Sequence, residues 1–174
     1  MNAPAERTIA AGLVRDFEAE LPKTRALLEA VPEEHLDWKP HEKSMTLRQL
    51  AAHIAEAPTW LPSMIEGDEM DFEGMADSYA PFSPKSTGEL LEAFEANAKS
   101  FRSAIEGLDD AFLSRDWTMR KGAEVLMSDP RDRVIRTILI HHLAHHRGQL
   151  TVYLRLLNVA VPATYGSTAD HSVF

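Results

Sequence analysis

The sequence contains no cysteine among its 174 residues. Disulfide bonds, thiolate metal ligands and cysteine nucleophiles are therefore excluded together. The chain also lacks an uninterrupted apolar run of about 18 residues, the length that a membrane-spanning helix requires. Its N-terminus has no apolar stretch of the signal-peptide type. We therefore expect a cytoplasmic protein that does not enter a membrane.

Basic residues are scarce relative to acidic ones. There are 18 Lys and Arg against 27 Asp and Glu, which gives a formal net charge of −9. A surface of this charge repels phosphate backbones, so we expect no nucleic-acid partner. Phosphate-cradling glycine loops, Ser-His-Asp arrangements and paired-carboxylate motifs are not evident either. With 44 % hydrophobic residues, the chain is long and apolar enough to form one domain, which we expect to span residues 1–174.

Apolar periodicity predicts four helices. Their approximate ranges are 7–30, 46–67, 86–107 and 129–157. Thr46 and Ser86 are each followed three residues later by Gln or Glu, the pattern of a capping box. Asp129 and Pro130 fit the N-cap and the first helical residue of the last helix. Pro22 is expected to kink the first helix.

The connections between these helices differ in length. The stretch 67–86 is acidic and rich in glycine and proline, and we interpret it as a long connection, with a short irregular helix as an alternative. Residues 117–127 give a weak hairpin signal around Lys121-Gly122. The pattern therefore predicts an all-α protein: a four-helix bundle with a long crossover connection and a small hairpin before the last helix.

Four of the eight histidines lie in the last predicted helix, at positions 141, 142, 145 and 146. Residues four apart share a helix face, so the cluster offers two stacked pairs. A helical wheel at about 100° per residue places His142 and His146 in the middle of the apolar stripe and His141 and His145 on its shoulder. Two inward-facing neutral imidazoles are a reasonable ligand pair for zinc, nickel or iron.

A third ligand is needed for a good site, and His53 is the best candidate. It lies on the second predicted helix, on a face shared with Leu50 and Trp60. Facing helices of a bundle commonly supply the ligands of an internal metal ion. His53 could instead be a hydrogen-bonded core histidine, and His141 or His145 could replace one ligand. The remaining histidines, His35, His41 and His171, are expected in solvent.

Two segments resemble signatures of a known family. Residues 142–150, with the sequence His-Leu-Ala-His-His-Arg-Gly-Gln-Leu, resemble the C-terminal signature of the DinB superfamily, also called the YfiT-like group. Residues 45–55 resemble its second-helix signature, including His53, and residues 38–40 and 162–166 resemble further family features. The resemblance implies a four-helix bundle with a long crossover, a divalent metal ion on His53, His142 and His146, and homodimers.

Three functions are compatible with such a site. The first is a transferase that activates a low-molecular-weight thiol for attack on an electrophile, which the similarity to bacterial thiol transferases and to a mycothiol-dependent isomerase supports. The second is a hydrolase that uses metal-activated water, with Glu56 as the only nearby carboxylate that could serve as a base. Glu56 could equally be a solvated surface residue. The third is a metal-binding homodimer without turnover. The first two act on a small-molecule substrate.

Residues around the predicted ligands carry expectations of their own. Gln149 lies beside the ligands on the wheel and is expected to hydrogen-bond a ring or a bound ligand. Arg147 is expected to point away from the core and pair with an acidic neighbour. Gly148 is expected to allow close approach of another helix. Trp60 and Tyr153 either line the pocket or belong to the plain core.

Overall fold

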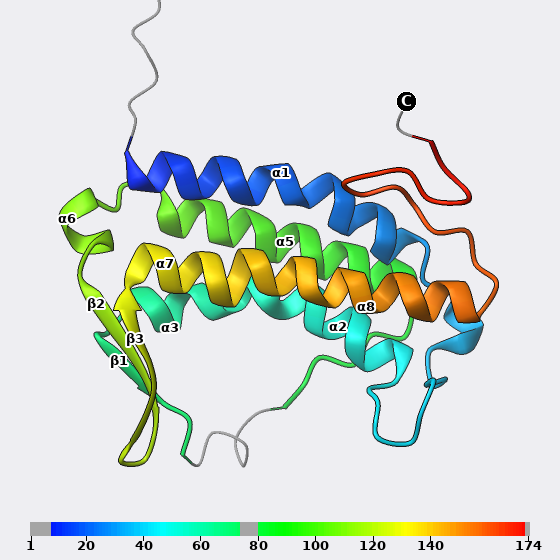
Figure 1. Ribbon diagram of the computed structural model, residues 1–174, viewed down its shortest axis with the longest axis horizontal. Coiled ribbons are helices and arrows are strands. Elements are labelled where there is room, and N and C mark those ends of the chain that lie inside the picture. The colour runs from blue at the N-terminus through cyan, green and yellow to red at the C-terminus, as the bar shows by residue number, and fades with distance from the viewer. Residues whose placement is uncertain (1–7, 74–79, 173–174) are drawn as a thin grey trace, which may run out of the picture.

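The computed structural model describes residues 8–73 and 80–172 (Figure 1). The protein is mostly helical and carries one small sheet, so the expectation of an all-α protein holds only in part. The helical segments are α1 (Ile9–Glu29), α2 (Leu47–Glu56), α3 (Leu61–Ile65), α5 (Thr87–Ile105), α6 (Asp110–Leu113), α7 (Arg131–Ile135) and α8 (His142–Leu156), with 3-10 turns at Glu33–His35 and Ala57–Trp60 and a π-helical segment at Arg136–His141. The strands are β1 (Glu69–Asp71), β2 (Asp116–Lys121) and β3 (Glu124–Pro130).

The long helices run side by side and enclose the core, while the sheet lies at one end (Figure 1). Apolar side chains from α1, α2, α5 and α8 form one buried cluster. Phe17 of α1 stacks on Phe101 of α5 with ring centroids 3.9 Å apart. Burial of such side chains supplies the main stabilisation of the fold, at about 25 cal/mol per Å² of apolar surface. Within the described residues, no helix is long and apolar enough to cross a bilayer.

Side-chain caps set the helix starts that the sequence predicted. Thr46 and Gln49 form a complete capping box at the start of α2. At α5 the box is only half formed: Ser86 accepts from the Glu89 amide, while the Glu89 carboxylate accepts from the Lys85 amide instead. Both starts therefore lie where the sequence placed them.

The second predicted helix is divided into three pieces. α2 ends at Glu56, a 3-10 turn spans Ala57–Trp60, and α3 follows from Leu61. Pro58 and Pro62 lack the amide proton that an uninterrupted α-helix would use, which favours this division. α1, in contrast, continues through Pro22 without a break.

The sheet has the order β1-β2-β3. β2 and β3 form the predicted hairpin, with a turn at Gly122, where the backbone φ is +56°. β1 was not predicted: it pairs in parallel with β2, as Met70 does with Met119. The predicted connection 67–86 thus begins with a strand, and its positions 74–79 lie outside the described residues.

Arg131 joins the sheet to the helices. Only 1 % of the residue is exposed. Its guanidinium donates to the carbonyl oxygens of Met64 (3.1 Å) and Gly67 (2.8 Å) and pairs with Asp68. The last carbonyl oxygens of a helix have no hydrogen-bond donor within the helix, and the Arg131 guanidinium supplies donors to such oxygens at the end of α3.

The last helix differs from the prediction at its start and in its middle. β3 continues to Pro130, so Pro130 holds the cap position, and Asp129 pairs with Arg133 at 3.2 Å rather than capping the helix. The expectation for Asp129 and Pro130 is therefore wrong by one residue, because strand pairing extends to the helix. The π-helical segment between α7 and α8 was also not predicted.

Candidate metal centre

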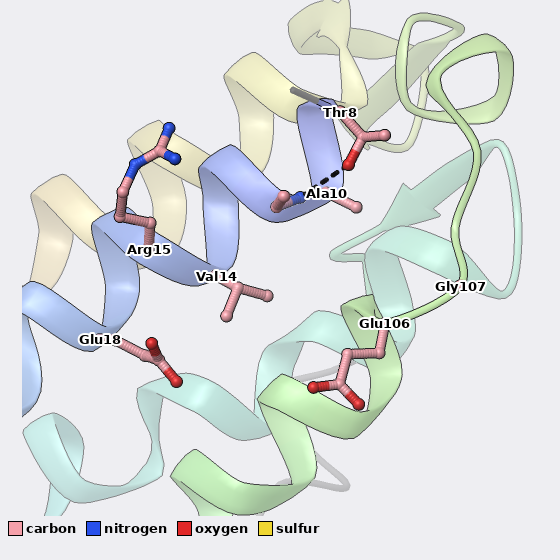
Figure 2. A pocket seen from close by; sticks show the side chains of 8 residues that line it. Thr8, Ala10, Val14, Arg15, Glu18, Glu106 and Gly107 are labelled. Atoms are coloured by element: carbon pink, nitrogen blue, oxygen red, sulfur yellow. Dashed lines mark hydrogen bonds between the residues drawn. The ribbon is translucent and has the colours of Figure 1, made fainter. Parts of the chain in front are cut away.

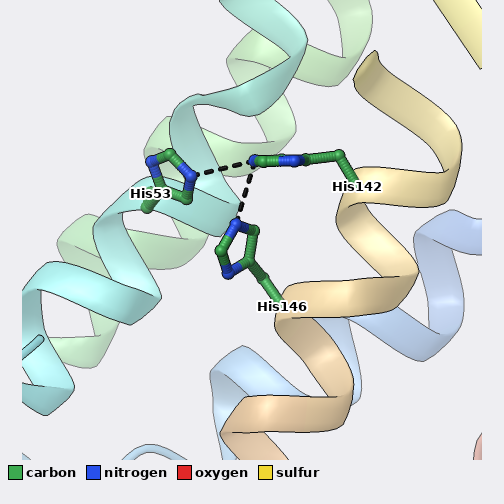
Figure 3. Close-up of side chains that lie close together, drawn as sticks. All are labelled: His53, His142 and His146. Atoms are coloured by element: carbon green, nitrogen blue, oxygen red, sulfur yellow. Dashed lines mark hydrogen bonds between the residues drawn. The ribbon is translucent and has the colours of Figure 1, made fainter. Parts of the chain in front are cut away.

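Three histidine side chains point toward one another from α2 and α8 (Figure 3). The Nε2 atom of His142 lies 3.0 Å from Nε2 of His53 and 2.9 Å from Nε2 of His146. The potential ligand atoms of all three residues lie within 4.8 Å of one another. Imidazole nitrogens that share a tetrahedral ion at about 2.0–2.1 Å are separated by roughly 3.3–3.4 Å, so the two Nε2–Nε2 separations at His142 are close to those of a shared ion.

Packing of α2 against α8 produces this convergence. His53 lies between the buried residues Ala52 and Ile54 on α2, and its ring faces α8. His142 is the first residue of α8 and His146 lies one turn later, so both rings project from the same side of the helix. The structure thus brings together the three residues that the sequence singled out.

The burial of these rings departs from the wheel. The buried positions of α8 are Leu143, His146, Arg147, Leu150 and Leu154. His142 is half-exposed and lies at the edge of that face, not in the middle of an apolar stripe. Part of the reason is the π-helical segment. Buried Val134 and Ile135 are followed by buried Leu139 and Ile140 five residues later, which is the spacing of a π-helical turn. This wider turn rotates the buried face of α7 relative to that of α8.

The histidine rings are held in their neutral form. Burial, followed by the positive charge that His146 could carry, lowers the pKa of His53 from 6.5 to about 4. Burial and the neighbouring histidines likewise lower the pKa of His142 to about 4. Burial also lowers the pKa of His146, although its hydrogen bond to Gln149 acts in the opposite direction. Near pH 7 each ring therefore offers a lone pair, which is the form that binds metal.

Gln149 orients one of these rings, as the sequence predicted. The Nδ1–H group of His146 donates to Oε1 of Gln149 at 2.7 Å. Because Nδ1 carries the proton, Nε2 of His146 is left with its lone pair directed at the other two histidines. Hydrogen bonds of this kind fix the tautomer and orientation of ligating histidines.

The other polar candidates lie around the three histidines. His141 and His145 are exposed. The His145 ring centroid is 4.8 Å from that of His146 and 6.4 Å from that of His142, but His145 is not part of the converging group. Glu56 is half-buried, and its Oε1 accepts a hydrogen bond from the Phe82 amide at 3.0 Å. This contact fastens the connection before α5 to α2; a role of Glu56 as a base stays a prediction.

The two aromatic candidates, Trp60 and Tyr153, lie in different surroundings. The Trp60 ring lies 5.0 Å from the ring of His53 and 5.2 Å from that of His142, so it lines the centre. Tyr153 packs instead against Trp38, with ring centroids 5.7 Å apart, and donates to the Met45 carbonyl. Of these two aromatic residues, only Trp60 has a ring contact with the three histidines among the described residues.

Two expectations about the α8 motif are wrong. Arg147 does not point away from the core: it is only 2 % exposed and pairs with Glu20 of α1. The expected acidic partner of Arg147 is confirmed as Glu20, but the sequence did not indicate that this pair would be buried. Gly148 is exposed, and a Cβ atom placed there would meet nothing within 4 Å, so it permits no close helix approach among the described residues.

An open hollow of the surface lies away from the histidines. It measures about 370 Å³ and lies between the start of α1 and the end of α5, lined in part by Val14, Glu18 and Glu106 (Figure 2). Glu18 is already paired there with Arg102 at 2.7 Å. None of the three converging histidines contributes to this hollow.

The fold and the histidine geometry together define a mostly helical protein with a candidate three-histidine metal centre. A family profile described as the DinB superfamily matches residues 16–150. Because this match covers most of the chain, the chain belongs to the DinB superfamily, which confirms the resemblance seen in the sequence.

Relatives and solved structures agree with this assignment. The uncharacterized protein YrdA of Bacillus subtilis is 24 % identical over 157 residues, covering 90 % of this chain and 88 % of YrdA. YjoA of the same species is 25 % identical over 145 residues, covering 82 % of this chain and 87 % of YjoA. A DinB-like protein from Bacillus cereus has a similar structure, with a TM-score of 0.66 and 24 % identity over 89 % of this chain and 97 % of that one. At this identity the structural likeness concerns the fold alone.

Proposed function

We propose that the protein is a metal-dependent transferase that activates a low-molecular-weight thiol for attack on an electrophile. The observation that carries the proposal is the convergence of His53, His142 and His146 through their Nε2 atoms. Three neutral nitrogen donors suit zinc, nickel or iron(II) and leave part of the coordination sphere to a substrate. A divalent ion held there supplies Lewis acidity, which lowers the pKa of a coordinated thiol.

The chain's own residues make specific contributions to this reaction. His53, His142 and His146 would hold the ion, and Gln149 keeps the donor nitrogen of His146 free of its proton. The sequence contains no cysteine, so the sulfur nucleophile must arrive as a cosubstrate. His142 is only half-buried, which supports access to the centre from solvent.

The test is a transfer assay with metal-loaded protein. Zinc-, nickel- and iron(II)-loaded samples are incubated with glutathione, mycothiol or bacillithiol and an electrophile such as an epoxide or an aryl halide, and thioether formation is followed by mass spectrometry. We expect thioether from at least one combination and none from the His53→Ala variant. Ester or amide hydrolysis without thioether formation would favour the hydrolase, and inactivity with every substrate would favour a metal-binding protein without turnover.

Further features belong to the same proposal. We propose that the long helices form a four-helix bundle with a long crossover, that residues 1–174 are a single domain, and that the protein is a cytoplasmic homodimer. The single buried apolar cluster supports one domain. Exposed apolar side chains on the outer side of α8, at Val152 (56 %) and Leu156 (55 %), support association of two copies. Light scattering coupled to size-exclusion chromatography measures the oligomeric state.

A further inference from the structure

Trp60 contacts two of the three candidate ligands without offering a ligand atom itself. Its ring centroid lies 5.0 Å from that of His53 at an interplanar angle of 54°, and 5.2 Å from that of His142 at 67°. Both separations fall in the range of about 4.5–7 Å over which tilted and edge-to-face aromatic pairs are attractive. The two histidines come from different helices, so the indole connects α2 and α8 at the centre itself.

The backbone that carries Trp60 is restrained on both sides. Trp60 ends the 3-10 turn Ala57–Trp60, which contains Pro58, and Pro62 follows two residues later. Proline fixes its own φ near −65° and restricts the residue before it. The Ser63 hydroxyl donates to the Trp60 carbonyl oxygen at 2.6 Å. The indole is therefore presented to the histidines from a segment with little backbone freedom.

A tryptophan in this place affects the bound state in two ways. Its packing limits the rotations of the His53 and His142 rings, so less conformational entropy is lost when they bind an ion. Imidazoles that coordinate a divalent ion also carry part of its positive charge, and the face of a tryptophan ring attracts a cation more strongly than the faces of other aromatic side chains do. Both effects strengthen metal binding.

We propose that Trp60 is a positioning residue of the metal centre, which holds the rings of His53 and His142 in their ligating orientation and stabilises their charge when an ion is bound. This inference rests on the metal site proposed above. It assigns Trp60 no contact with the ion. It predicts that the affinity for metal, rather than the fold, depends on this side chain.

The experiment compares metal affinity in matched variants. Zinc affinity is measured by competition with a chromogenic chelator for wild type, Trp60→Ala, Trp60→Phe and Trp38→Ala. Trp38 is the control because it is likewise half-exposed and has one edge-to-face partner, Tyr153, away from the histidines. Second-sphere substitutions typically weaken metal affinity by about 10–100-fold, and we expect a loss of at least tenfold in Trp60→Ala. Trp60→Phe should lose less, and Trp38→Ala should bind like wild type.

A merely structural role is separated by two further readouts. Thermal unfolding of the metal-free proteins checks that Trp60→Ala folds, and Trp60→Phe carries the test if it does not. The visible spectrum of the cobalt(II)-loaded protein reports coordination geometry and should change in the Trp60 variants only. Cobalt(II) should also quench tryptophan emission in wild type and in Trp38→Ala, but far less in Trp60→Phe.

The outcomes distinguish the two proposals. Wild-type affinity and an unchanged cobalt spectrum in Trp60→Ala would overturn the positioning role while leaving the metal centre intact. If wild-type protein itself binds no zinc, nickel, cobalt(II) or iron(II), the metal centre fails and the role of Trp60 fails with it. Equal losses in Trp60→Ala and Trp38→Ala would show a general effect on the fold and would also overturn the inference.

Discussion

Replacing Arg147 with methionine should destabilise the protein strongly, because the substitution leaves a carboxylate buried without its main partner. Arg147 donates to the Glu20 carbonyl oxygen (2.9 Å), to Oγ1 of Thr24 (3.0 Å) and to the hydroxyl of Tyr165 (2.8 Å), and it pairs with the Glu20 carboxylate. The side chains of Arg147 and Glu20 are only 2 % and 10 % exposed. Methionine keeps the aliphatic bulk of the side chain but removes all of these donors.

The expected magnitude follows from the cost of an unpaired buried charge. Removing one partner of a buried ion pair costs about 3–5 kcal/mol, and we expect a value near the lower limit. Two contacts to Glu20 remain, from the Tyr165 hydroxyl and from Lys23 at 3.3 Å. Urea unfolding of metal-free protein at pH 7, followed by circular dichroism, measures the loss. The double variant with Glu20→Gln and Arg147→Met should be more stable than Arg147→Met alone, because no charge is then left unpaired.

The pH dependence gives a second check. Burial alone would raise the pKa of Glu20, but hydrogen bonds from Tyr165 and Arg147 and the charge of Arg147 hold it below its ordinary value of 4.5. A carboxylate with a depressed pKa stabilises the fold above about pH 4.5, and this contribution is lost as the pH falls further. The difference between wild type and Arg147→Met should therefore shrink below pH 4.5. A loss under about 1 kcal/mol at pH 7, or a difference that stays constant down to pH 3, would contradict a stabilising role of the buried pair of Arg147 and Glu20.

Three further predictions concern α8 and the histidines. Gly148→Ala should stabilise the protein by about 0.5–1 kcal/mol in urea unfolding, because alanine favours the helix and its Cβ would enter open space. Gln149→Ala should weaken zinc affinity by about tenfold in chelator competition, with little change in unfolding, because the His146 tautomer is no longer fixed. Metal-free protein should lose stability as the pH falls from about 6.5 to about 4, because unfolding frees His53 and His142 to take up protons that the folded state excludes; the urea midpoint of the His53→Ala variant should fall less over this range.

Local signals in the sequence were sufficient for the starts of α2 and α5. A hydroxyl at Thr46 or Ser86 can satisfy an amide only three residues away, so the pattern is readable without tertiary contacts. The strand β1 is different. Its three residues pair with β2, about 50 positions later, and no local pattern encodes such a partner.

The convergence of the three histidines was also predictable, but the face that they occupy was not. Histidine spacing on α8 fixes which rings share a side. The apolar face of the second predicted helix indicated His53 as the third ligand, as the family resemblance also implied. The wheel failed in part because it assumes an uninterrupted α-helix, whereas Arg136–His141 is π-helical, and in part because it placed Leu156 in the inward stripe, although this side chain is exposed. It also treated Arg147 as a surface residue, although the partner that allows its burial, Glu20, lies on α1.

Metal binding in matched variants tests most directly whether His53, His142 and His146 together hold one divalent ion. Chelator-stripped, untagged protein is dialysed against limiting zinc, and the metal bound per chain is measured by elemental analysis. We expect one equivalent for wild type and for His145→Ala, the exposed neighbour, and a marked loss for His53→Ala and His142→Ala. Full occupancy in both of those variants, or loss of the ion in His145→Ala, would contradict this three-histidine site.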